Sequence, residues 1–210
     1  MYIAERNEYV QYREAGILFW LLWVAATAVG AFAGHYLEGQ ILTVRLPGAF
    51  DILAAGAGGA VAGVIIGLLQ GLILMPYIKM QGAIEWLIAT ILGRTASGIV
   101  IFLYADALAG LFLDNNYTTI CGLIFLRLLL GGLLGLLISL PQYFVLRHRS
   151  RNARFWPMSN IGVSMVTTYI TTLTVGTFYG LVTGAATGYA MVDVLRNPTK
   201  HAEWRVREGL

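Results

Sequence analysis

Two arginines stand inside long apolar stretches of the sequence. Arg94 lies within the apolar run 84–108, and Arg127 lies within the run 119–146. At about 1.5 Å of rise per helical residue, both would lie near mid-depth in a hydrocarbon layer of about 30 Å. A charge at that depth costs roughly 3 kcal/mol or more, so both arginines are candidates for binding a ligand or a partner.

The chain offers no obvious counter-ion for these two arginines. Glu85 and Asp193 fall near one edge of the predicted spans, and Asp106 falls near the other. Three kinds of partner stay open: backbone carbonyls, hydroxyls and water; a carboxylate on another subunit; or an anionic ligand, substrate or lipid headgroup. Thr90 precedes Arg94 by four residues and shares its predicted helix face, so it joins the candidate site.

Three predicted helices share one pattern, in which two small residues four positions apart are followed three positions later by a polar residue. The pattern small-x3-small-x2-polar occurs at Gly63, Gly67 and Gln70, at Gly135, Ser139 and Gln142, and at Gly180, Gly184 and Thr187. Gly131 extends the small face of the second copy. Small residues four apart let helix backbones approach closely in a membrane, and a polar side chain one turn later can hydrogen-bond across the contact. Two interpretations stay open: packing alone, or three polar side chains that converge to line a site.

The second copy belongs to a longer motif. Residues 135–147 read GLLISLPQYFVLR, and 153–156 read ARFW. This resembles a family of uncharacterised bacterial multi-pass membrane proteins that repeat a Gly-x3-Gly-x2-Gln-Trp-Leu-Val-Leu-Arg hairpin followed by a Trp. The resemblance covers about residues 56–198 and departs from the pattern at Gly71 and Tyr143, which replace the Trp after Gln. It implies a multi-pass protein of the bacterial cytoplasmic (inner) membrane and no particular activity.

The first two copies also share the residues that come after them. In each, a basic turn is followed by a Trp and then by a Gly, at Trp86 and Gly93 and at Trp156 and Gly162. We expect these glycines to be equivalent positions of a repeated hairpin.

The composition determines which elements carry these residues. Of the 210 residues, 58% are hydrophobic and 12% are charged, and the mean hydropathy is +0.71. A soluble domain carries about 25% charged residues. The apolar residues form blocks that meet the requirement of about 20 residues for a membrane-spanning helix. We therefore expect an all-α integral membrane protein, a bundle of about six transmembrane helices with glycine-rich packing faces.

The predicted transmembrane domain covers 17–195, between a polar segment 1–16 and a polar tail 196–210. Its spans are expected at about 17–37, 52–78, 84–108, 119–146, 155–172 and 175–195. The last two divide an apolar stretch of about 41 residues, which is too long for one crossing. Residues 31–33 resemble a signal-peptidase site, but the leading segment is acidic, so we expect the first span to be retained.

The basic residues favour one side of the membrane. With six spans and a cytoplasmic amino terminus, eleven of the 14 Lys and Arg residues are cytoplasmic, and only Arg45 lies outside. The positive-inside rule therefore predicts that both termini are cytoplasmic. Trp86, Trp156 and Trp204 are expected at the inner interface.

A basic turn is expected to contact anionic lipid headgroups at about 1 kcal/mol per charge. It contains Arg147, Arg149, Arg151 and Arg154.

The sequence lacks the residues that several classes of functional site require. Cys121 is the single cysteine, so neither an intrachain disulfide nor a cysteine metal site can form. The sequence contains neither a phosphate-binding loop nor a His-Glu-x2-His pair, and its net charge of +3 does not resemble a nucleic-acid footprint. His35, near the outer end of the first span, could ligate a haem or chlorophyll metal, or bond a loop carbonyl. We predict no catalytic residue, no metal, no cofactor and no nucleic-acid partner.

Two functional hypotheses follow. The first is a non-enzymatic accessory or scaffold subunit that packs against other membrane subunits, or itself, in a larger complex. The alternative is a small-molecule transport component whose topology resembles the substrate-binding subunits of energy-coupling-factor transporters, with an anion or polar ligand near Arg94 and Arg127. In that case Ala26, Gly30 and Gly34 would form a docking stripe, although the long outer loops of such binders are missing.

Overall fold

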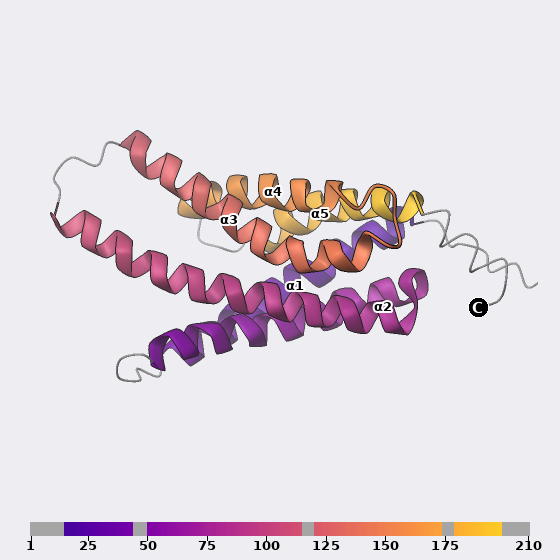
Figure 1. Ribbon diagram of the computed structural model, residues 1–210, viewed down its shortest axis with the longest axis horizontal. Helices are drawn as coiled ribbons and strands as arrows, with labels where there is room; N and C mark the ends of the chain where they lie inside the picture. Colours follow the sequence, from indigo (N-terminus) through magenta and orange to yellow (C-terminus); the bar gives the residue numbers. More distant parts are fainter. Residues whose placement is uncertain (1–14, 44–49, 115–119, 174–178, 199–210) are drawn as a thin grey trace, which may run out of the picture.

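The computed structural model describes residues 15–43, 50–114, 120–173 and 179–198, and these ranges are helical apart from short turns (Figure 1). Their helices are α1 (Ile17–Thr43), α2 (Phe50–Asp114), α3 (Ile120–Leu146), α4 (Phe155–Leu173) and α5 (Tyr179–Arg196). Three segments are long and apolar enough to cross a membrane: Ile17–Ile41, Asp51–Tyr104 and Ile124–Leu146. The prediction of an all-α protein is confirmed for the described residues, and three of its helical segments are compatible with membrane spans.

The second helix differs from the prediction. We expected separate spans at 52–78 and 84–108, but α2 is one element of 65 residues with a break at Lys79, where φ is 60° and ψ is 171°. Pro76 lies just before the break and cannot donate the backbone hydrogen bond of a helix interior. One residue therefore makes the reversal that we assigned to a loop. The described residues contain five helices, and the prediction of six is not confirmed.

The two arms of α2, residues 50–78 and 80–114, pack against each other. A Cβ atom added to Gly63 would lie 2.8 Å from Ile91 Cα, and one added to Gly59 would meet the backbone of Arg94. Such distances are below ordinary contact, so only glycine permits this approach.

The turn between α3 and α4 is tied to the end of α5. Ser150 donates its hydroxyl hydrogen bond to the Val194 carbonyl at 2.6 Å, and the Arg151 amide donates to the Asn197 carbonyl at 2.9 Å. The reversal within α2 and the end of α5 lie at the same end of the bundle as this turn (Figure 1). We call this end of the bundle the basic end.

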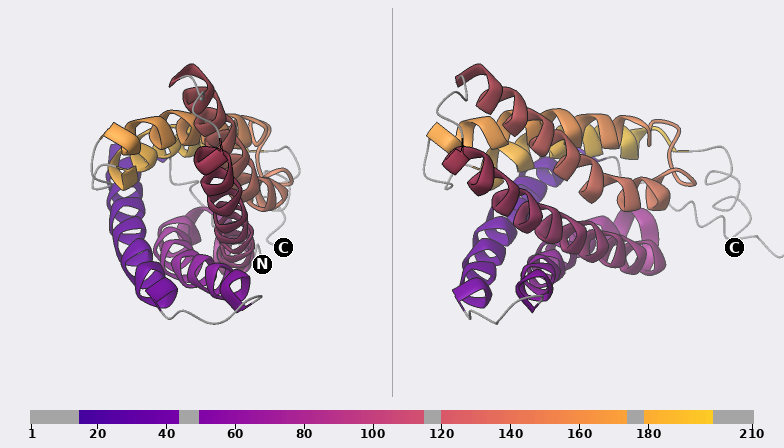
Figure 2. Two further views of the ribbon diagram at one scale, coloured as in Figure 1. Left: turned by 90° about the vertical axis from the view of Figure 1, so that its left-hand side faces the viewer. Right: turned by 60° about the vertical axis from the view of Figure 1, so that its left-hand side comes forward.

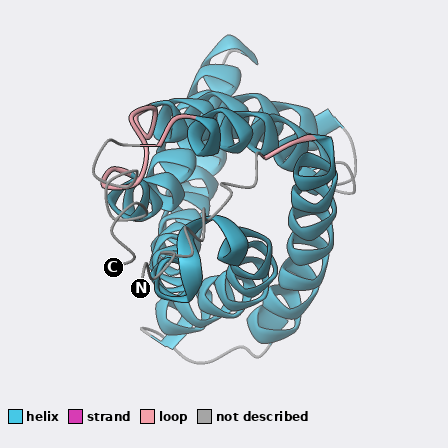
Figure 3. Cartoon of the chain, turned by 90° about the vertical axis from the view of Figure 1, so that its right-hand side faces the viewer, coloured by secondary structure: helices cyan, strands magenta, loops and turns pink. Residues whose placement is uncertain are grey.

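Viewed end-on, the helices surround a common axis (Figures 2 and 3). Around the ring, α1 contacts the first arm of α2, the second arm contacts α3, α3 contacts α4, α4 contacts α5, and α5 contacts α1. The first and last helices also meet at the basic end, where Arg196 Nε donates a hydrogen bond to the Ala15 carbonyl at 3.0 Å. The chain thus closes on itself without a covalent link.

Candidate functional site

Three tryptophans form a layer across the bundle near the basic end. The ring centroids of Trp23, Trp86 and Trp156 lie 5.4–5.9 Å apart, and each pair meets edge to face. All three side chains are buried, and each is at most 2% exposed. Trp86 and Trp156 therefore do not present their rings to lipid or water, their depth in a membrane stays a prediction, and Trp204 lies outside the described residues. A buried indole needs a partner for its N–H, and this bundle supplies one for each.

In two copies of the repeat, a glutamine supplies that partner and bridges two helices. Gln70 Oε1 accepts a hydrogen bond from Trp86 Nε1 at 3.3 Å, and Gln70 Nε2 donates to Thr27 Oγ1 at 3.0 Å. The second copy has the same pair of bonds, each at 2.9 Å, from Trp156 to Gln142 and from Gln142 to Thr90. Each amide is thus satisfied at both its oxygen and its nitrogen.

The third copy is built differently because Thr187 stands where the others have glutamine. Its hydroxyl accepts a hydrogen bond from Trp23 Nε1 at 3.2 Å and donates to the Thr183 carbonyl of its own helix at 2.6 Å. Asn160, which corresponds to Thr27 and Thr90, donates to the Trp156 carbonyl at 2.9 Å instead. A hydroxyl therefore replaces the amide bridge at this junction.

The small residues position the three junctions in one register. A Cβ on Gly63, Gly135 or Gly180 would in each case crowd the residue five positions after the tryptophan of the adjacent helix. Those residues are Ile91, Ile161 and Ala28. The helix pairs therefore repeat about an approximate threefold axis, and the third pair combines α5 with α1.

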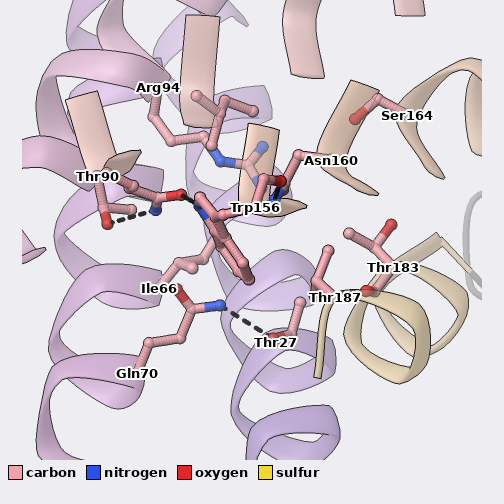
Figure 4. Close-up of a pocket in the computed structure, with 12 residues that line it drawn as sticks. Thr27, Ile66, Gln70, Thr90, Arg94, Trp156, Asn160, Ser164, Thr183 and Thr187 are labelled. Carbon is pink, nitrogen blue, oxygen red and sulfur yellow. Dashed lines mark hydrogen bonds between the residues drawn. The ribbon is translucent and has the colours of Figure 1, made fainter. Parts of the chain in front are cut away.

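A cavity lies beside the tryptophan layer, lined by the bridging residues (Figure 4). It offers about 30 Å³ to the centres of water-sized molecules, which is room for about two waters. Six lining residues are the three equivalent pairs of the repeat: Thr27 with Gln70, Thr90 with Gln142, and Asn160 with Thr187. The cavity therefore lies on the approximate threefold axis.

Arg94 brings a positive charge to this cavity. Figure 4 shows its side chain extending from α2 toward Asn160. Arg94 Nε is buried and has no hydrogen-bond partner among the described residues. The Thr183 hydroxyl also lines the cavity, and it is likewise buried without a partner in the described part of the chain. Two unmet polar groups thus border one small polar space.

The structure brings together five of the six residues predicted to bind a ligand or partner. They are Arg94, Thr90, Gln70, Gln142 and Thr187. Arg127 is not among the cavity residues: it is half-buried on α3 and interacts electrostatically with Tyr104. The packing residues Gly131, Gly135 and Ser139 are buried on α3, as are Gly180 and Gly184 on α5.

Sequence reasoning missed five polar or aromatic residues of the site: Trp23, Thr27, Asn160, Ser164 and Thr183. A signal for three of them exists, because Trp is followed four residues later by Thr or Asn at Trp23, Trp86 and Trp156. In the first two copies the tryptophan helix follows its glycine helix in the sequence. In the third copy the order is reversed, because the tryptophan helix α1 precedes its glycine helix α5, so the sequence does not show that the two form a pair.

The basic turn is partly engaged within the chain. Arg149 Nη2 lies 2.8 Å from Glu85 Oε2, so this arginine forms an ion pair instead of being free for a headgroup. The guanidinium of Arg147 lies 4.9 Å from the Phe144 ring centroid. Three arginines, at 147, 151 and 154, are exposed, and their contact with headgroups stays a prediction.

His35 is exposed on α1. Within 15–43, 50–114, 120–173 and 179–198, no three His, Cys, Asp or Glu side chains gather as they would around a metal ion. No protein-family model matches this chain, and neither does any curated protein or solved structure. The resemblance to the multi-pass family stays an expectation.

Proposed function

We propose that this chain is a six-span membrane protein that binds a small anion in its central cavity, as a transport-related binding component. Arg94 carries the proposal, because its buried Nε borders a polar cavity and has no hydrogen-bond partner among the described residues. A cation in that setting is stabilised by an anion that supplies both charge and acceptors. The cavity admits only a small one.

The helix dimensions support six crossings. The apolar part of α2, Asp51–Tyr104, has 54 residues and contains the break at Lys79, so each arm is long enough for one crossing. Helices α4 and α5 have 19 and 18 residues, or about 27–29 Å at 1.5 Å per residue, close to a hydrocarbon thickness of about 30 Å. The basic end would then face the cytoplasm.

The scaffold hypothesis loses two of its supports. The glycine faces of α2, α3 and α5 pack against helices of the same chain, and Arg94 borders a cavity that side chains of this chain line.

The proposed docking stripe of α1 is also occupied. A Cβ on Gly30 would lie 2.9 Å from an Ile66 side-chain atom, and one on Gly34 would lie 2.9 Å from Ala62 Cβ. Ala26 is buried as well. This stripe packs against α2, so the prediction that it docks a transport partner is wrong.

Thermal unfolding of the purified chain in lipid nanodiscs, with sodium salts of small anions at constant ionic strength, tests the proposal. An anion at about 100 times its Kd should stabilise the protein by about 2.7 kcal/mol. Arg94→Gln should abolish this response. Arg127→Gln is the matched control, since it removes an intramembrane charge outside the cavity, and its response should persist.

The opposite result is equally clear. If no small anion stabilises the wild-type chain, or if Arg94→Gln responds like the wild type, anion binding at this cavity is disproved. Recovery with stoichiometric membrane partners that dissociate on Arg94→Gln would instead support the accessory-subunit hypothesis.

A further inference from the structure

The bridge at two of the three helix junctions is an amide, and the third junction has a shorter side chain in its place. Gln70 and Gln142 each join a tryptophan to a threonine across the cavity wall. Thr187 occupies the equivalent position in the third copy with a side chain shorter by two heavy atoms, and it donates to its own helix instead. Space that a glutamine would fill is therefore available beside Thr187 and Asn160, which both line the cavity.

Two of the three unmet buried polar groups among the described residues border this junction. In the other two copies, the positions equivalent to Thr183 hold Ile66 and Ile138, whose side chains have no polar atoms to satisfy. Thr183 brings a buried hydroxyl without a partner among the described residues. The buried Nε of Arg94 likewise has no hydrogen-bond partner among the described residues, and the Arg94 side chain extends toward Asn160 (Figure 4).

We infer that the ligand is a small planar oxyanion that takes the place of the missing third amide, an assignment that rests on the proposed anion-binding function. A planar oxyanion has the flat shape of a glutamine amide group but carries oxygen acceptors at both ends, and a guanidinium binds two such oxygens through two parallel hydrogen bonds. The Arg94 guanidinium binds oxygens on one side of the anion, while Asn160 and Thr183 donate hydrogen bonds from the other side. A cavity with room for about two waters fits formate, with nitrate and bicarbonate as the next larger anions.

Thr187→Gln tests this assignment directly. The new amide should accept from Trp23 and contact Asn160, which completes the ring. We expect a higher melting temperature without ligand and an affinity for formate and nitrate that is lower by about tenfold or more. Thr187→Ser is the matched control, because it keeps a short hydroxyl side chain and should retain the affinity. Isothermal titration calorimetry in nanodiscs measures both.

Arg94→Lys tests the planar geometry separately from the charge. Lysine keeps the charge but cannot form two parallel hydrogen bonds to one oxyanion. The wild-type chain should bind formate and nitrate more tightly than chloride, and this preference should largely disappear in Arg94→Lys.

Each alternative outcome is decisive. If Thr187→Gln binds nitrate as tightly as the wild type while Arg94→Gln does not bind, the assignment is overturned and the proposed function stands. Equal binding of chloride and nitrate by the wild type also overturns it. If Thr187→Gln does not fold, an unchanged preference over chloride in Arg94→Lys overturns it. Failure of the wild type to bind any of these anions disproves both proposals.

Discussion

Tryptophan and glutamine side chains hold the centre of this bundle in pairs. An indole in a membrane protein commonly lies at the headgroup level, where water or lipid accepts its N–H hydrogen bond. Trp86 and Trp156 are buried within the bundle, and Gln70 and Gln142 accept that bond inside the protein. The two side chains of each pair depend on one another: without the amide, a buried donor is left unmet.

Gln142→Leu should therefore destabilise the protein. Leucine is close to glutamine in size, but it leaves Trp156 Nε1 without its acceptor and removes the bond to Thr90. We expect a loss of about 1–2 kcal/mol in the free energy of unfolding, measured by denaturation in mixed micelles.

Gln81→Leu is the control for this change. Gln81 is exposed and bonds Glu85, one helical turn away, at 3.1 Å. Its replacement should change stability by less than about 0.5 kcal/mol. Equal effects of the two substitutions would show that the buried amide contributes nothing beyond its volume.

The sequence identified several of these residues for good physical reasons. Helical geometry places the small-x3-small-x2-polar residues on one face, which pointed to Gln70, Gln142 and Thr187. The cost of a charge in hydrocarbon pointed to Arg94, but it pointed equally to Arg127. The rotation of each helix about its axis decides which of the two arginines faces the cavity. That rotation is set by the neighbouring helices, and the sequence alone does not reveal which helices are neighbours.

Close approach of helices through glycine is the feature that arranges the elements. A Cβ on Gly135 would lie 2.5 Å from the Asn160 carbonyl oxygen, well inside contact distance. The spacing of small residues predicted this role correctly for the glycines of the repeat, because residues four apart share one helix face.

The same reasoning was wrong for the glycine that follows each tryptophan. We grouped Gly93 with Gly162, but a Cβ on Gly93 would lie 2.7 Å from Ile138 Cα, whereas one on Gly162 would meet no atom within 4 Å. Gly93 follows its tryptophan by seven residues and Gly162 by six. One residue turns a side chain by about 100° around a helix, so Gly162 does not lie on the contact face.

Gly135→Ala and Gly162→Ala should consequently differ. The first forces α3 and α4 apart and should cost about 1–3 kcal/mol by overpacking. The second adds a methyl group where no atom lies within 4 Å, so it should be neutral. Thermal unfolding in nanodiscs compares them, and similar melting temperatures would contradict the observed packing of α3 on α4.

The turn within α2 is shorter than the loop that we predicted there. Charge and polarity around Lys79 suggested a loop at 79–83, whereas the reversal is completed by one non-helical residue. Hydropathy locates where a chain must turn, but backbone dihedral angles decide how many residues the turn takes.

At the scale of the whole molecule, three similar helix pairs form a closed ring whose third pair joins the two ends of the sequence. Gly180 and Gly184 of α5 pack against Ala28 and Val24 of α1, as the glycines of α2 and α3 pack against the helices that follow them. The sequence showed the three glycine helices, but it could not show this closure, because the partner of the last one lies near the opposite end of the chain. The helix made first therefore completes its packing only when the last is made.

A disulfide between α1 and α5 tests the closure. A Cβ on Gly180 would lie 2.8 Å from Ala28 Cα, so cysteines at these positions come within bonding range once the two helix backbones move apart slightly. In a Cys121→Ala background, Ala28→Cys with Gly180→Cys should cross-link on mild oxidation. With a protease site placed between Asp114 and Ile120, the cut chain should run as one band until it is reduced.

Gly39→Cys with Gly180→Cys is the control for this cross-link. No atom lies within 4 Å of a Cβ on Gly39, and a disulfide requires its two Cβ atoms to approach within about 4.5 Å. The fragments of this control should therefore separate without reduction. Separate fragments from the Ala28 pair would mean that α1 and α5 do not close the ring, and the third junction, with the anion site built on it, would then have no structural basis.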